Sequence, residues 1–541
     1  MVAAGVTAVV AIAVAGAVVV TTQGSGNSAE PEGAMAAPRF VDASDASGID
    51  HAYTGDFDYF VGGGVAVFDC DDDARPDLYF AGGSSPAALY RNASTVGGPL
   101  RFDPVPSPVT DLASVTGAYP IDIDSDGQLD LVVLRHGENE ILRGLGDCRF
   151  ETDSELGIDS GDQWTTAFSA TWEGDAALPT LAFGTYLGPD RTPCGDSALG
   201  RPDGDRYGRA TALSPGYCTL SMLFSDWNRT GQRDLRLTND RHYYTDGSEQ
   251  LWALPPDGPP RLYTEADGWR PMQVWGMGIA SQDVTGDGLP EVFITSQGDN
   301  KLQSLDGVTA TPTYADLALR RGVTAQRPYT GGDVLPSTAW HPEFEDVNND
   351  GLVDLFVSKG NVEGQTDHAM RDPNNLLIGQ PDGTFVEGAE AAGIVTFERS
   401  RGASLVDLDL DGLLDLVVVN REEPVEVWHN VGSGDASEVT ALGNWLAIDL
   451  EQPAPNIDAI GAWLEVRVDG PATTREVTIG GGHAGGKSGW IHAGLGTAEG
   501  AEVRVTWPDG EVGDWIRVDA NRFVTIRRGS DEPTQRETPT G

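Results

Sequence analysis

The sequence is poor in basic residues, and lysine is especially rare. It contains 35 Lys and Arg against 83 Asp and Glu, so the formal net charge is −48 at pH 7. The lysines are Lys301, Lys359 and Lys487 alone. Nucleic acids and anionic membrane surfaces are bound through basic patches, so this composition argues against both as partners. An excess of negative charge instead favours cations and keeps a protein soluble.

Cysteine and enzyme-type motifs are also sparse. There are four cysteines and no C-x-x-C pair, which gives no support to a zinc-ribbon or thioredoxin-like protein. The count fits an exported protein with one or two disulfides, and Cys194 and Cys218 are the expected pair because they flank a Gly/Pro/Arg-rich insertion. No G-x-S-x-G or H-E-x-x-H motif occurs. The repeats described below show no sustained 3.6-residue periodicity, which argues against a helical solenoid.

The longest apolar run lies at the N-terminus. Residues 2–20 are uncharged and consist mainly of Ala, Val, Gly and Ile, with no basic residue before them. The length predicts either a membrane anchor or a signal peptide over residues 1–20, followed by a flexible linker over 21–38. Each alternative places the rest of the chain outside the cytoplasm, whether secreted, periplasmic or anchored. Contact with a membrane is expected only through this segment.

One acidic pattern recurs along the chain. The stretch DLDLDGLLDLVVVN at 407–420 places D-x-D-x-D-G-x-x-D before an apolar strand, and related copies begin at 69, 122, 226, 283 and 346. A gap of 104 residues between the copies at 122 and 226 predicts a hidden repeat near 172, where SATWEGDAALPTLAFGTY keeps the strand without the acidic residues. A second pattern, with an aromatic start and a Gly-apolar end, runs in phase at 40–49, 150–158, 314–323 and 385–394. Seven such units predict a seven-bladed β-propeller over residues 39–435.

The spacing of the acidic residues is that of a calcium loop. Ca²⁺ takes six to eight oxygen ligands in flexible geometry, and side chains at loop positions 1, 3, 5 and 9 with a carbonyl at position 7 supply them. Glycine at position 6 permits the turn. The predicted metal ligands at positions 1, 3, 5 and 9 of the six copies are Asp69, Asp71, Asp73, Asp77, Asp122, Asp124, Asp126, Asp130, Asp226, Asn228, Thr230, Asp234, Asp283, Thr285, Asp287, Glu291, Asp346, Asn348, Asp350, Asp354, Asp407, Asp409, Asp411 and Asp415.

Calcium is therefore the expected cofactor, at up to six sites. The strongest sites are expected at 122–130, 346–354 and 407–415, and weaker ones at 69–77, where Ala74 replaces glycine, and at 226–234, which has only two carboxylates. Zinc and copper are not expected, because no histidine or cysteine is placed to ligate them. The alternative is acidic surface turns without metal, but closely spaced carboxylates repel one another unless a cation neutralises them.

The composition changes after residue 438. Alternating apolar and polar stretches separated by Gly/Pro/Asp turns predict a small antiparallel β-sandwich-like domain over 442–529, with a disordered tail over 530–541. Residues 481–488, GGHAGGKS, satisfy the phosphate-loop pattern G-x-x-x-x-G-K-S. A phosphate loop must open a helix, and none is expected here, so a glycine-rich loop between strands is the preferred interpretation. The expected fold class is all-β.

The two parts resemble known families. The D-x-D-x-D-G repeats resemble the FG-GAP/VCBS repeats of integrin-like β-propellers. NIDAIGAWLEVRV (456–468), IHAGLG (491–496) and VRVTWPDG (503–510) resemble the ASPIC/UnbV domain. With GGGVAVFDCDDD (62–73), the chain from about 39 to 529 resembles the cartilage acidic protein family and its bacterial relatives. This resemblance implies an exported calcium-binding propeller involved in cell-surface or matrix interactions, without an established catalytic centre.

The leading functional hypothesis is a calcium-stabilised binding and adhesion module for a protein or glycan ligand at the cell surface or in the periplasm. The sequence shows no motif that pairs a nucleophile with a base, and no catalytic residue is predicted. The alternative is an enzyme, either a hydrolase or lyase or a natural-product tailoring enzyme, with its site in the central funnel of the propeller. His341, Asp333 and Arg401 are the polar residues considered for such a site.

Overall fold

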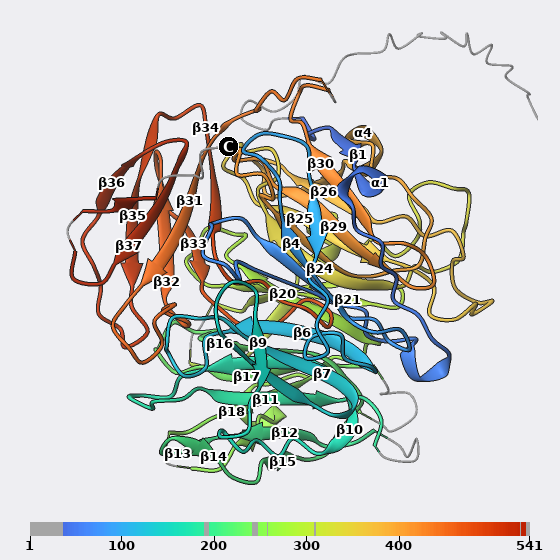
Figure 1. Cartoon of the computed structure of the whole chain (residues 1–541), viewed down its shortest axis with the longest axis vertical. Helices are drawn as coiled ribbons and strands as arrows, with labels where there is room; N and C mark the ends of the chain where they lie inside the picture. Colours follow the sequence, from blue (N-terminus) through green and yellow to red (C-terminus); the bar gives the residue numbers. More distant parts are fainter. Residues whose placement is uncertain are drawn as a thin grey trace, which may run out of the picture.

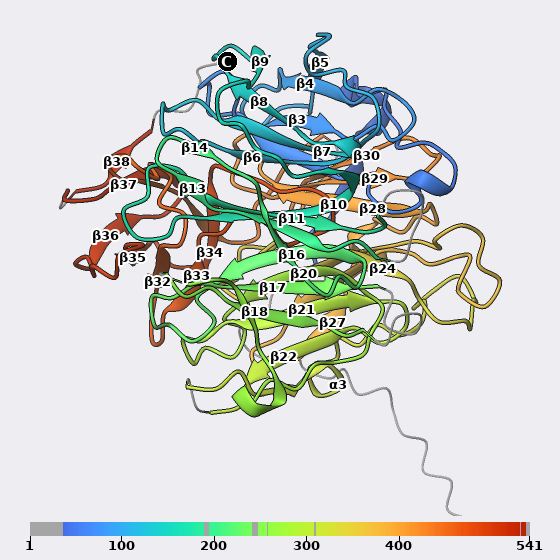
Figure 2. The ribbon, with the colours of Figure 1, turned by 90° about the horizontal axis from the view of Figure 1, so that it is seen from below.

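The structure is a computed structural model that describes residues 36–188, 194–240, 247–256, 258–307, 310–435, 437–530 and 532–536. The segment expected to be an anchor or signal, 1–20, and most of the expected linker lie outside the described residues. Within the described ranges, no helix is long and apolar enough to cross a membrane. The regular secondary structure of the described residues is almost entirely β-strand, as expected (Figures 1 and 2).

The described residues from 40 to 430 form seven antiparallel four-stranded blades, of which five are separate sheets and two are joined in one eight-stranded sheet. Blade 1 consists of β2 (Val65–Phe68), β3 (Asp77–Phe80), β4 (Ala88–Asn92) and β5 (Phe102–Pro104). Blade 2 consists of β6 (Val115–Ile121), β7 (Asp130–Glu138), β8 (Glu140–Gly144) and β9 (Phe150–Thr152). Blade 3 consists of β10 (Asp162–Thr171), β11 (Thr180–Thr185), β12 (Ser197–Gly200) and β15 (Thr211–Leu213). In blades 4 and 5 the strands are β16 (Thr219–Ser225), β17 (Asp234–Asn239), β18 (Gln250–Ala253), β19 (Arg261–Leu262); β20 (Gly276–Gln282), β21 (Glu291–Ser296), β22 (Lys301–Leu305), β23 (Tyr314–Asp316). In blades 6 and 7 they are β24 (Ala339–Glu345), β25 (Asp354–Lys359), β26 (Asn375–Gly379), β27 (Phe385–Glu387); β28 (Ser400–Val406), β29 (Asp415–Asn420), β30 (Glu426–Asn430), β1 (Phe40–Asp42).

The blades close into a ring. The first strands of successive blades contact one another from β2 through β28, and β28 contacts β2 again. The N-terminal strand β1 is the outermost strand of blade 7. It pairs with β30, with Phe40 opposite Asn430, and so joins the start of the propeller to its last blade. The expected seven-bladed propeller is confirmed, and the first strands of the blades surround its central channel.

The second sequence pattern marks the outer edge of the blades. The strands β1, β23 and β27 are each followed by a one-turn helix, α1 (Ser44–Ser47), α3 (Ala318–Arg321) and α4 (Ala389–Ala392). Each helix ends at a glycine in the left-handed region, with φ of 85°, 83° and 84° at Gly48, Gly322 and Gly393. Glycine adopts this conformation without steric cost, which explains the recurring Gly-apolar end.

The middle strands of the blades are buried on both faces. In β29, every residue from Asp415 to Asn420 is buried, because blades 6 and 7 pack face to face. A strand covered on both sides reads as a continuous apolar run, whereas a strand with one face in water alternates. This explains the sequence LVVVN and its counterparts in the other blades.

A few short elements and two disulfides complete the propeller. A hairpin of β13 (Pro202–Asp203) and β14 (Arg206–Tyr207) lies outside the sheet of blade 3, and short 3₁₀ turns, η1 (Phe57–Tyr59) and η3 (Glu265–Asp267), lie in blades 1 and 4. β10 also pairs with β7, which joins blades 2 and 3. The expected Cys194–Cys218 disulfide is confirmed, and a second disulfide joins Cys70 to Cys148.

The C-terminal strands form two packed four-stranded sheets beside the propeller (Figure 1). The first consists of β34 (Ile491–Gly496), β31 (Asn444–Glu451), β37 (Arg522–Arg527) and β38 (Thr534–Gln535); the second of β33 (Thr473–Glu476), β32 (Trp463–Arg467), β35 (Gly500–Thr506) and β36 (Ile516–Asp519). The pairing differs from expectation in two places. β31 and β37 run parallel, and β38, in the segment expected to be a disordered tail, pairs with β37.

Candidate metal centre and the loop that fills the channel

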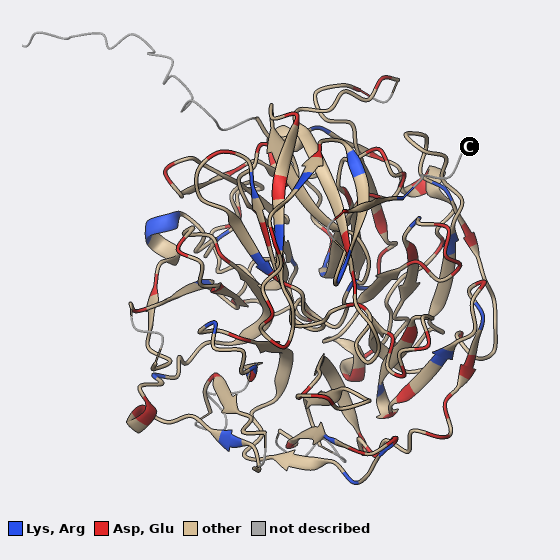
Figure 3. Ribbon diagram, turned by 90° about the vertical axis from the view of Figure 1, so that its left-hand side faces the viewer, with Lys and Arg blue, Asp and Glu red and all other residues tan. Residues whose placement is uncertain are grey.

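Six loops between the first and second strands of blades carry the predicted metal ligands. We call them the acidic loops, and they are residues 69–77, 122–130, 226–234, 283–291, 346–354 and 407–415. In each, position 9 is the first residue of the second strand, so the early alternation of DLDLD is loop and the strand begins at Asp415. Acidic residues also lie on many other loops (Figure 3), so most of the negative charge lies outside these sites.

Backbone hydrogen bonds hold the acidic loop of blade 7 in shape. The carboxylate of Asp407 accepts hydrogen bonds from the N–H groups of Asp411 (3.1 Å) and Gly412 (2.8 Å). Asp415 accepts from Leu408 (3.0 Å) and from Asn430 on the third strand (2.8 Å). These bonds engage both oxygens of each carboxylate and fix the positions of the two side chains in the loop.

Two left-handed residues make this turn possible. In blade 7 they are Leu410 at position 4 (φ 57°) and Gly412 at position 6 (φ 87°). The equivalent of Gly412 in blade 1 is Ala74, with φ of 75°, which an L-residue adopts only with strain. Gly412 has a second reason to lack a side chain, since a Cβ there would lie 1.8 Å from the ring of Trp445 in β31.

In three loops, the carboxylates at positions 1, 3 and 9 converge. One oxygen from each lies within 4.8 Å of the others in blades 1, 2 and 7. In blade 7, Asp409 is completely buried, its Oδ1 accepts no hydrogen bond from the described residues, and its Oδ2 has only His429 Nε2 beside it, at 3.2 Å. Oδ2 of Asp411 is likewise buried without such a bond. Buried polar atoms without a partner are rare and costly, and a cation among these carboxylates would satisfy them.

Burial raises the pKa values of these carboxyl groups in the absence of a cation. In blade 2, burial raises the pKa of Asp122 to about 6 and that of Asp130 to about 8, although backbone hydrogen bonds oppose both shifts. In blade 7, burial and then the neighbouring acidic residues raise the pKa values of Asp407 and Asp415 well above their ordinary range. The charged state of such groups needs a neutralising partner.

In blades 1 and 2, an arginine of the third strand supplies part of that neutralisation. Arg91 Nε lies 3.2 Å from Asp71 Oδ2. Arg143 lies 3.0 Å from Asp124 and 2.9 Å from Asp126. Two of the four carboxylates in the blade 2 loop therefore already have a cationic partner.

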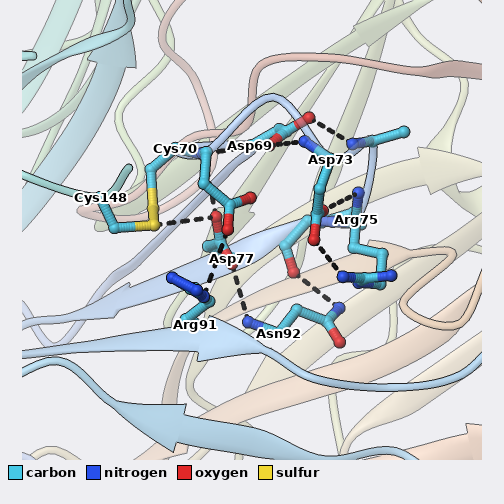
Figure 4. The surroundings of a disulfide bond; sticks show 11 residues. Asp69, Cys70, Asp73, Arg75, Asp77, Arg91, Asn92 and Cys148 are labelled. Carbon is cyan, nitrogen blue, oxygen red and sulfur yellow. Dashed lines mark hydrogen bonds and ion pairs between the residues drawn. A yellow bond between two sulfur atoms is a disulfide. The ribbon is translucent and has the colours of Figure 1, made fainter. Parts of the chain in front are cut away.

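The disulfide beside the blade 1 loop crosses to blade 2 (Figure 4). Cys70 lies at loop position 2, and Cys148 lies in the turn between β8 and β9. Asp77 accepts a hydrogen bond from the N–H of Asn92 (2.7 Å), and its Oδ2 lies 3.6 Å from Cys148 Sγ. The bond thus fixes the ninth residue of one loop against the neighbouring blade.

The loops of blades 4, 5 and 6 differ in how far their own polar groups satisfy the carboxylates. In blade 4, Asp234 accepts hydrogen bonds from Trp227 Nε1 (2.9 Å) and the hydroxyl of Tyr263 (2.8 Å). In blade 5, Glu291 accepts from both the N–H and the hydroxyl of Thr285. In blade 6, burial raises the pKa of Asp354 well above its ordinary value, as it does in blade 7.

Blade 3 replaces the acidic loop with a protein ion pair. Its Glu173 accepts hydrogen bonds from Thr180 (2.5 Å) and from Arg201, whose two nitrogens lie 2.7 Å from the two carboxylate oxygens. The repeat expected to lack metal ligands therefore stabilises the same turn with an arginine.

One potential ligand escaped the sequence interpretation. His429 in β30 lies with Nε2 3.2 Å from Oδ2 of Asp409, and the two residues converge with Asp411 within 4.8 Å. The expectation that no histidine is placed to ligate is therefore wrong for blade 7. His429 lies 18 residues after Asp411, and only the pairing of β29 with β30 brings them together.

The C-terminal domain rests on the acidic loops. Asn349 of blade 6 lies 2.6 Å from His492 Nε2, and Trp490 donates to the carbonyl of Ala74 in blade 1 (3.2 Å). The guanidinium of Arg229 in blade 4 lies 4.1 Å from the ring centre of Trp463. The loops that carry the candidate ligands are thus also the seat of the second domain.

The glycine-rich stretch with the phosphate-loop pattern extends from this domain into the propeller. We call residues 477–490, between β33 and β34, the channel loop. It makes isolated β-bridges with the first strands of blades 1 to 5. Its partners in these bridges are Val67, Ala118, Ala170, Leu223 and Ile279. The loop therefore lies in the central channel. It connects two strands and opens no helix, so it is a glycine-rich loop between strands, as the sequence indicated.

Close backbone contact requires glycine on both sides of the channel wall. A Cβ on Gly64 of blade 1 would lie 1.8 Å from the carbonyl oxygen of Ala484, and one on Gly485 would lie 2.3 Å from that of Val65. The glycine-rich composition of the channel loop is thus explained by packing against strand backbones.

Charged residues fasten the channel loop to blade 6. Nζ of Lys487 lies 2.5 Å from both Glu343 and Glu345 of β24, and Arg475 donates two hydrogen bonds to Glu345 (2.9 and 2.8 Å). Burial alone would raise the pKa of Glu345, but the charges of Arg475 and Lys487 outweigh it and lower this pKa to about 2. The cluster is a set of mutual ion pairs between the two domains.

His483 occupies the interior of the channel. It is completely buried, its Nε2 accepts a hydrogen bond from the N–H of Gly62 (3.2 Å), and its Nδ1 lies 3.2 Å from the carbonyl of Met277. These partners define a neutral ring with the proton on Nδ1. Burial lowers the pKa of His483 to about 3.

The three residues considered for a funnel enzyme do not form one site. His341 accepts a hydrogen bond from the N–H of His483 (3.1 Å) and so contacts the channel loop. Arg401 is buried and donates to backbone carbonyls, among them that of Phe60 (3.1 Å). Asp333 lies in the loop before β24, where it accepts from backbone N–H groups.

Three cavities lie near the domain junction, among them one of about 260 Å³ between the acidic loop of blade 6 and the C-terminal domain. One of about 280 Å³ lies between the acidic loops of blades 1 and 7 and the C-terminal domain, with Asp449, Asp458 and Trp490 in its wall. Another of about 120 Å³ lies beside the channel loop at His341 and Lys487. The cavity of about 280 Å³ offers a concave surface lined by both domains.

Two protein families match parts of the chain. Residues 69–133 and 346–418 match the FG-GAP-like repeat, and residues 452–533 match the family described as ASPIC and UnbV. FG-GAP-like repeats and an ASPIC/UnbV domain are therefore present, as the sequence patterns predicted. No curated protein sequence matches the chain.

Solved structures are similar to the chain at low sequence identity. A lectin of Agrocybe aegerita, described as recognising non-reducing terminal N-acetylglucosamine, is 15% identical over 69% of this chain and 92% of that chain, with a TM-score of 0.40. PorZ, a surface component of the type-IX secretion system of Porphyromonas gingivalis, is 13% identical over 88% and 61%, with a TM-score of 0.42. The extracellular domain of a hybrid two-component system of B. thetaiotaomicron is 8% identical over 91% and 57%, with a TM-score of 0.40. Likeness of this degree says nothing about ligands.

Proposed function

We propose that the chain is an exported, calcium-stabilised β-propeller that acts as a binding or adhesion module for a protein or glycan. The observation that carries this proposal is the geometry shared by the acidic loops, in which one oxygen each from positions 1, 3 and 9 lies within 4.8 Å of the others in blades 1, 2 and 7. A hard cation with oxygen ligands would satisfy these carboxylates, and Ca²⁺ takes six to eight oxygens in such loops.

The six acidic loops fit calcium to different degrees. Blade 6 presents Asp346, Asp350 and Asp354, and the third strand beside them carries the uncharged Ile378. In blades 1 and 2, an arginine competes with a cation for the same carboxylates. We therefore propose the firmest calcium site in blade 6, with blade 2 weaker than its four aspartates alone would indicate.

Calcium in these loops would also hold the C-terminal domain. The domain contacts backbone and side chains of the loops, for example through Trp490 and Ala74. Neutralising the carboxylates would fix the loop conformations on which these contacts depend. Ions would therefore stabilise both the blades and the junction between the domains.

The test is thermal unfolding of the full chain with Ca²⁺, with EDTA, and with EDTA followed by excess Ca²⁺. Chelation is expected to lower the Tm, and re-added Ca²⁺ is expected to restore it, with Mg²⁺ at equal ionic strength as the control. Calorimetric titration gives the number of sites. An unchanged melt in EDTA together with no heat of Ca²⁺ binding would overturn the proposal.

An extracytoplasmic location is part of the proposal. Two disulfides support it, since such bonds persist in oxidising compartments. The order of FG-GAP-like repeats and an ASPIC/UnbV domain supports membership of a cartilage acidic protein-like group. A screen of glycans and secreted proteins, with and without Ca²⁺, tests ligand binding. The channel loop occupies the funnel in which an enzyme would have its site, and this favours the binding module over the enzyme.

A further inference from the structure

The register of the second and third strands gives every blade one equivalent position, at or just after the third strand. In blade 7, Leu416 follows the loop and pairs with Trp428, and the next residue along β30 is His429. In blade 1, Leu78 pairs with Tyr90, and the next residue is Arg91. We call this site the third-strand position. From blade 1 to blade 7 it holds Arg91, Arg143, Arg201, Ala253, Ser304, Ile378 and His429.

Every basic side chain at the third-strand position contacts an acidic residue of its loop. Arg91 reaches Asp71 and Arg143 reaches Asp124, at 3.2 and 3.0 Å. Blade 3 repeats the contact without any of the metal ligands, since Arg201 lies 2.7 Å from Glu173. The pairing of the second and third strands therefore sets the position of this side chain beside the loop. The residue type decides whether the loop receives a positive charge, a metal-binding nitrogen or an uncharged group.

Arginine and histidine bring opposite chemistry to a cation site. A guanidinium carries only donors and a permanent charge, so it competes with a metal ion for the carboxylates. An imidazole offers a nitrogen lone pair and is a common metal ligand. Among the third-strand positions, blade 7 alone holds a residue with such a nitrogen.

The geometry around His429 is that of ligands around a common point. Nε2 of His429 lies 3.2 Å from Oδ2 of Asp409, a distance that suits an ion pair or two ligands of one cation, and Oδ1 of Asp409 has no hydrogen-bond partner within the described part of the chain. An oxygen of Asp411 completes the group, and all three atoms lie within 4.8 Å of one another. Asp409 is completely buried, so its carboxylate cannot turn to water instead.

We propose that the acidic loop of blade 7 binds a divalent transition-metal ion, of the Zn²⁺ class, through Asp409, Asp411 and Nε2 of His429, in preference to Ca²⁺. Ca²⁺ takes oxygen ligands, whereas imidazole nitrogen suits zinc and its neighbours in the first transition row. The inference rests on the proposed function in one respect, that the loop holds a cation. The other acidic loops offer only oxygen and remain calcium sites.

The experiment uses the untagged full chain, dialysed against Co²⁺ in a large excess of Ca²⁺. Co²⁺ replaces Zn²⁺ as a probe because its visible absorption reports its ligands. Elemental analysis is expected to find one Co²⁺ per chain, and His429→Ala and Asp409→Asn are each expected to lose it. His136→Ala, which removes an exposed histidine outside the loops, is the control and is expected to keep it.

A gain-of-site variant keeps the test sharp if the blade 7 variants fail to fold. Arg143→His places an imidazole at the third-strand position of blade 2, beside Asp124 and Asp126, and the side chain it replaces is 39% exposed. It is expected to raise the Co²⁺ content to two per chain. Zn²⁺ is expected to displace the bound Co²⁺ and abolish its absorption.

The outcomes separate this inference from the proposed function. Calcium binding without retained Co²⁺, or Co²⁺ content unaffected by His429→Ala, would overturn the inference and leave the calcium proposal standing. Binding of neither ion would overturn both. Retained Co²⁺ that depends on His429, in a chain that binds no Ca²⁺, would support the inference alone.

Discussion

Lys487 of the channel loop lies 2.5 Å from Glu345 of β24, so a residue of the C-terminal domain neutralises a carboxylate inside the propeller. The same lysine reaches Glu343, and Arg475 completes the cluster. The two domains are therefore joined by charge inside the channel as well as by contacts on the acidic loops.

Replacing Lys487 tests this junction. Lys487→Met leaves Arg475 as the partner of Glu345, and only His341 and a backbone N–H as partners of Glu343. Removing one member of a buried ion pair costs about 3–5 kcal/mol. We expect the free energy of unfolding in urea to fall by about this amount. The control is Arg527→Met, which breaks a pair with Glu451 in which both side chains are 48% exposed and should cost less than about 1 kcal/mol. Equal losses in the two variants would contradict the buried junction.

The close approach of the channel loop to blade 1 gives a second prediction. In Gly64→Ala, the new Cβ would lie 1.8 Å from the carbonyl oxygen of Ala484, so the loop must move. Overpacking of this kind costs about 1–3 kcal/mol. We expect a lower Tm and faster proteolysis of residues 477–490. Gly208→Ala, where a Cβ would meet nothing within 4 Å, should leave both unchanged; matching behaviour of the two variants would argue against the packed channel.

His483 predicts a specific pH dependence. Its pKa falls from an ordinary 6.5 to about 3 because burial disfavours the charged ring, and the nearby Arg401 and His341 lower the pKa further. The unfolded chain binds a proton below pH 6.5 while the folded chain does not. The stability contributed by the neutral ring is therefore complete above pH 6.5. It is lost as pH falls toward 3, at about 1.4 kcal/mol per pH unit.

The measurement is the free energy of unfolding of the wild type and of His483→Gln between pH 7.5 and 4.5. Glutamine can keep a donor and an acceptor but does not titrate. The wild type is expected to lose stability faster than the variant as the pH falls below 6.5. His136→Gln serves as the exposed counterpart. Parallel pH profiles of the wild type and His483→Gln would show that the ring does not stay neutral in the channel.

The two disulfides should differ in their contribution. Cys70–Cys148 spans 78 residues and Cys194–Cys218 spans 24. In the chain-entropy description, the longer loop gives the greater stabilisation, by about 1 kcal/mol out of about 3–5 kcal/mol for each. Paired serine variants of each disulfide, compared by urea unfolding, test this. A larger loss from the Cys194–Cys218 pair would show that local packing outweighs loop length.

Much of the propeller could be predicted because its signals are local and repeated. The turn at Asp407–Asp415 needs carboxylates two residues apart and a left-handed glycine, and both appear in consecutive letters of the sequence. The outer helices end at glycines such as Gly393 for an equally local reason. Six copies of one pattern gave the blade count and the missing loop of blade 3.

The contacts that join distant segments could not be predicted in the same way. His429 reaches Asp409 only through the register of β29 and β30, and one residue of slippage would turn its side chain to the other face. The parallel pairing of β31 with β37 also depends on how two sheets pack, since alternation alone does not give strand direction.

By itself, the sequence determined the all-β class, the repeat number and the positions of the acidic loops, because turn chemistry and strand burial are encoded within a few residues. Tertiary structure decided which side chains meet across blades and domains. It alone places the glycine-rich loop of 477–490 in the propeller channel, where strand backbones leave no room for side chains. It also placed a histidine beside one set of aspartates and an arginine beside three other loops. Strand register, which no local pattern records, sets that difference.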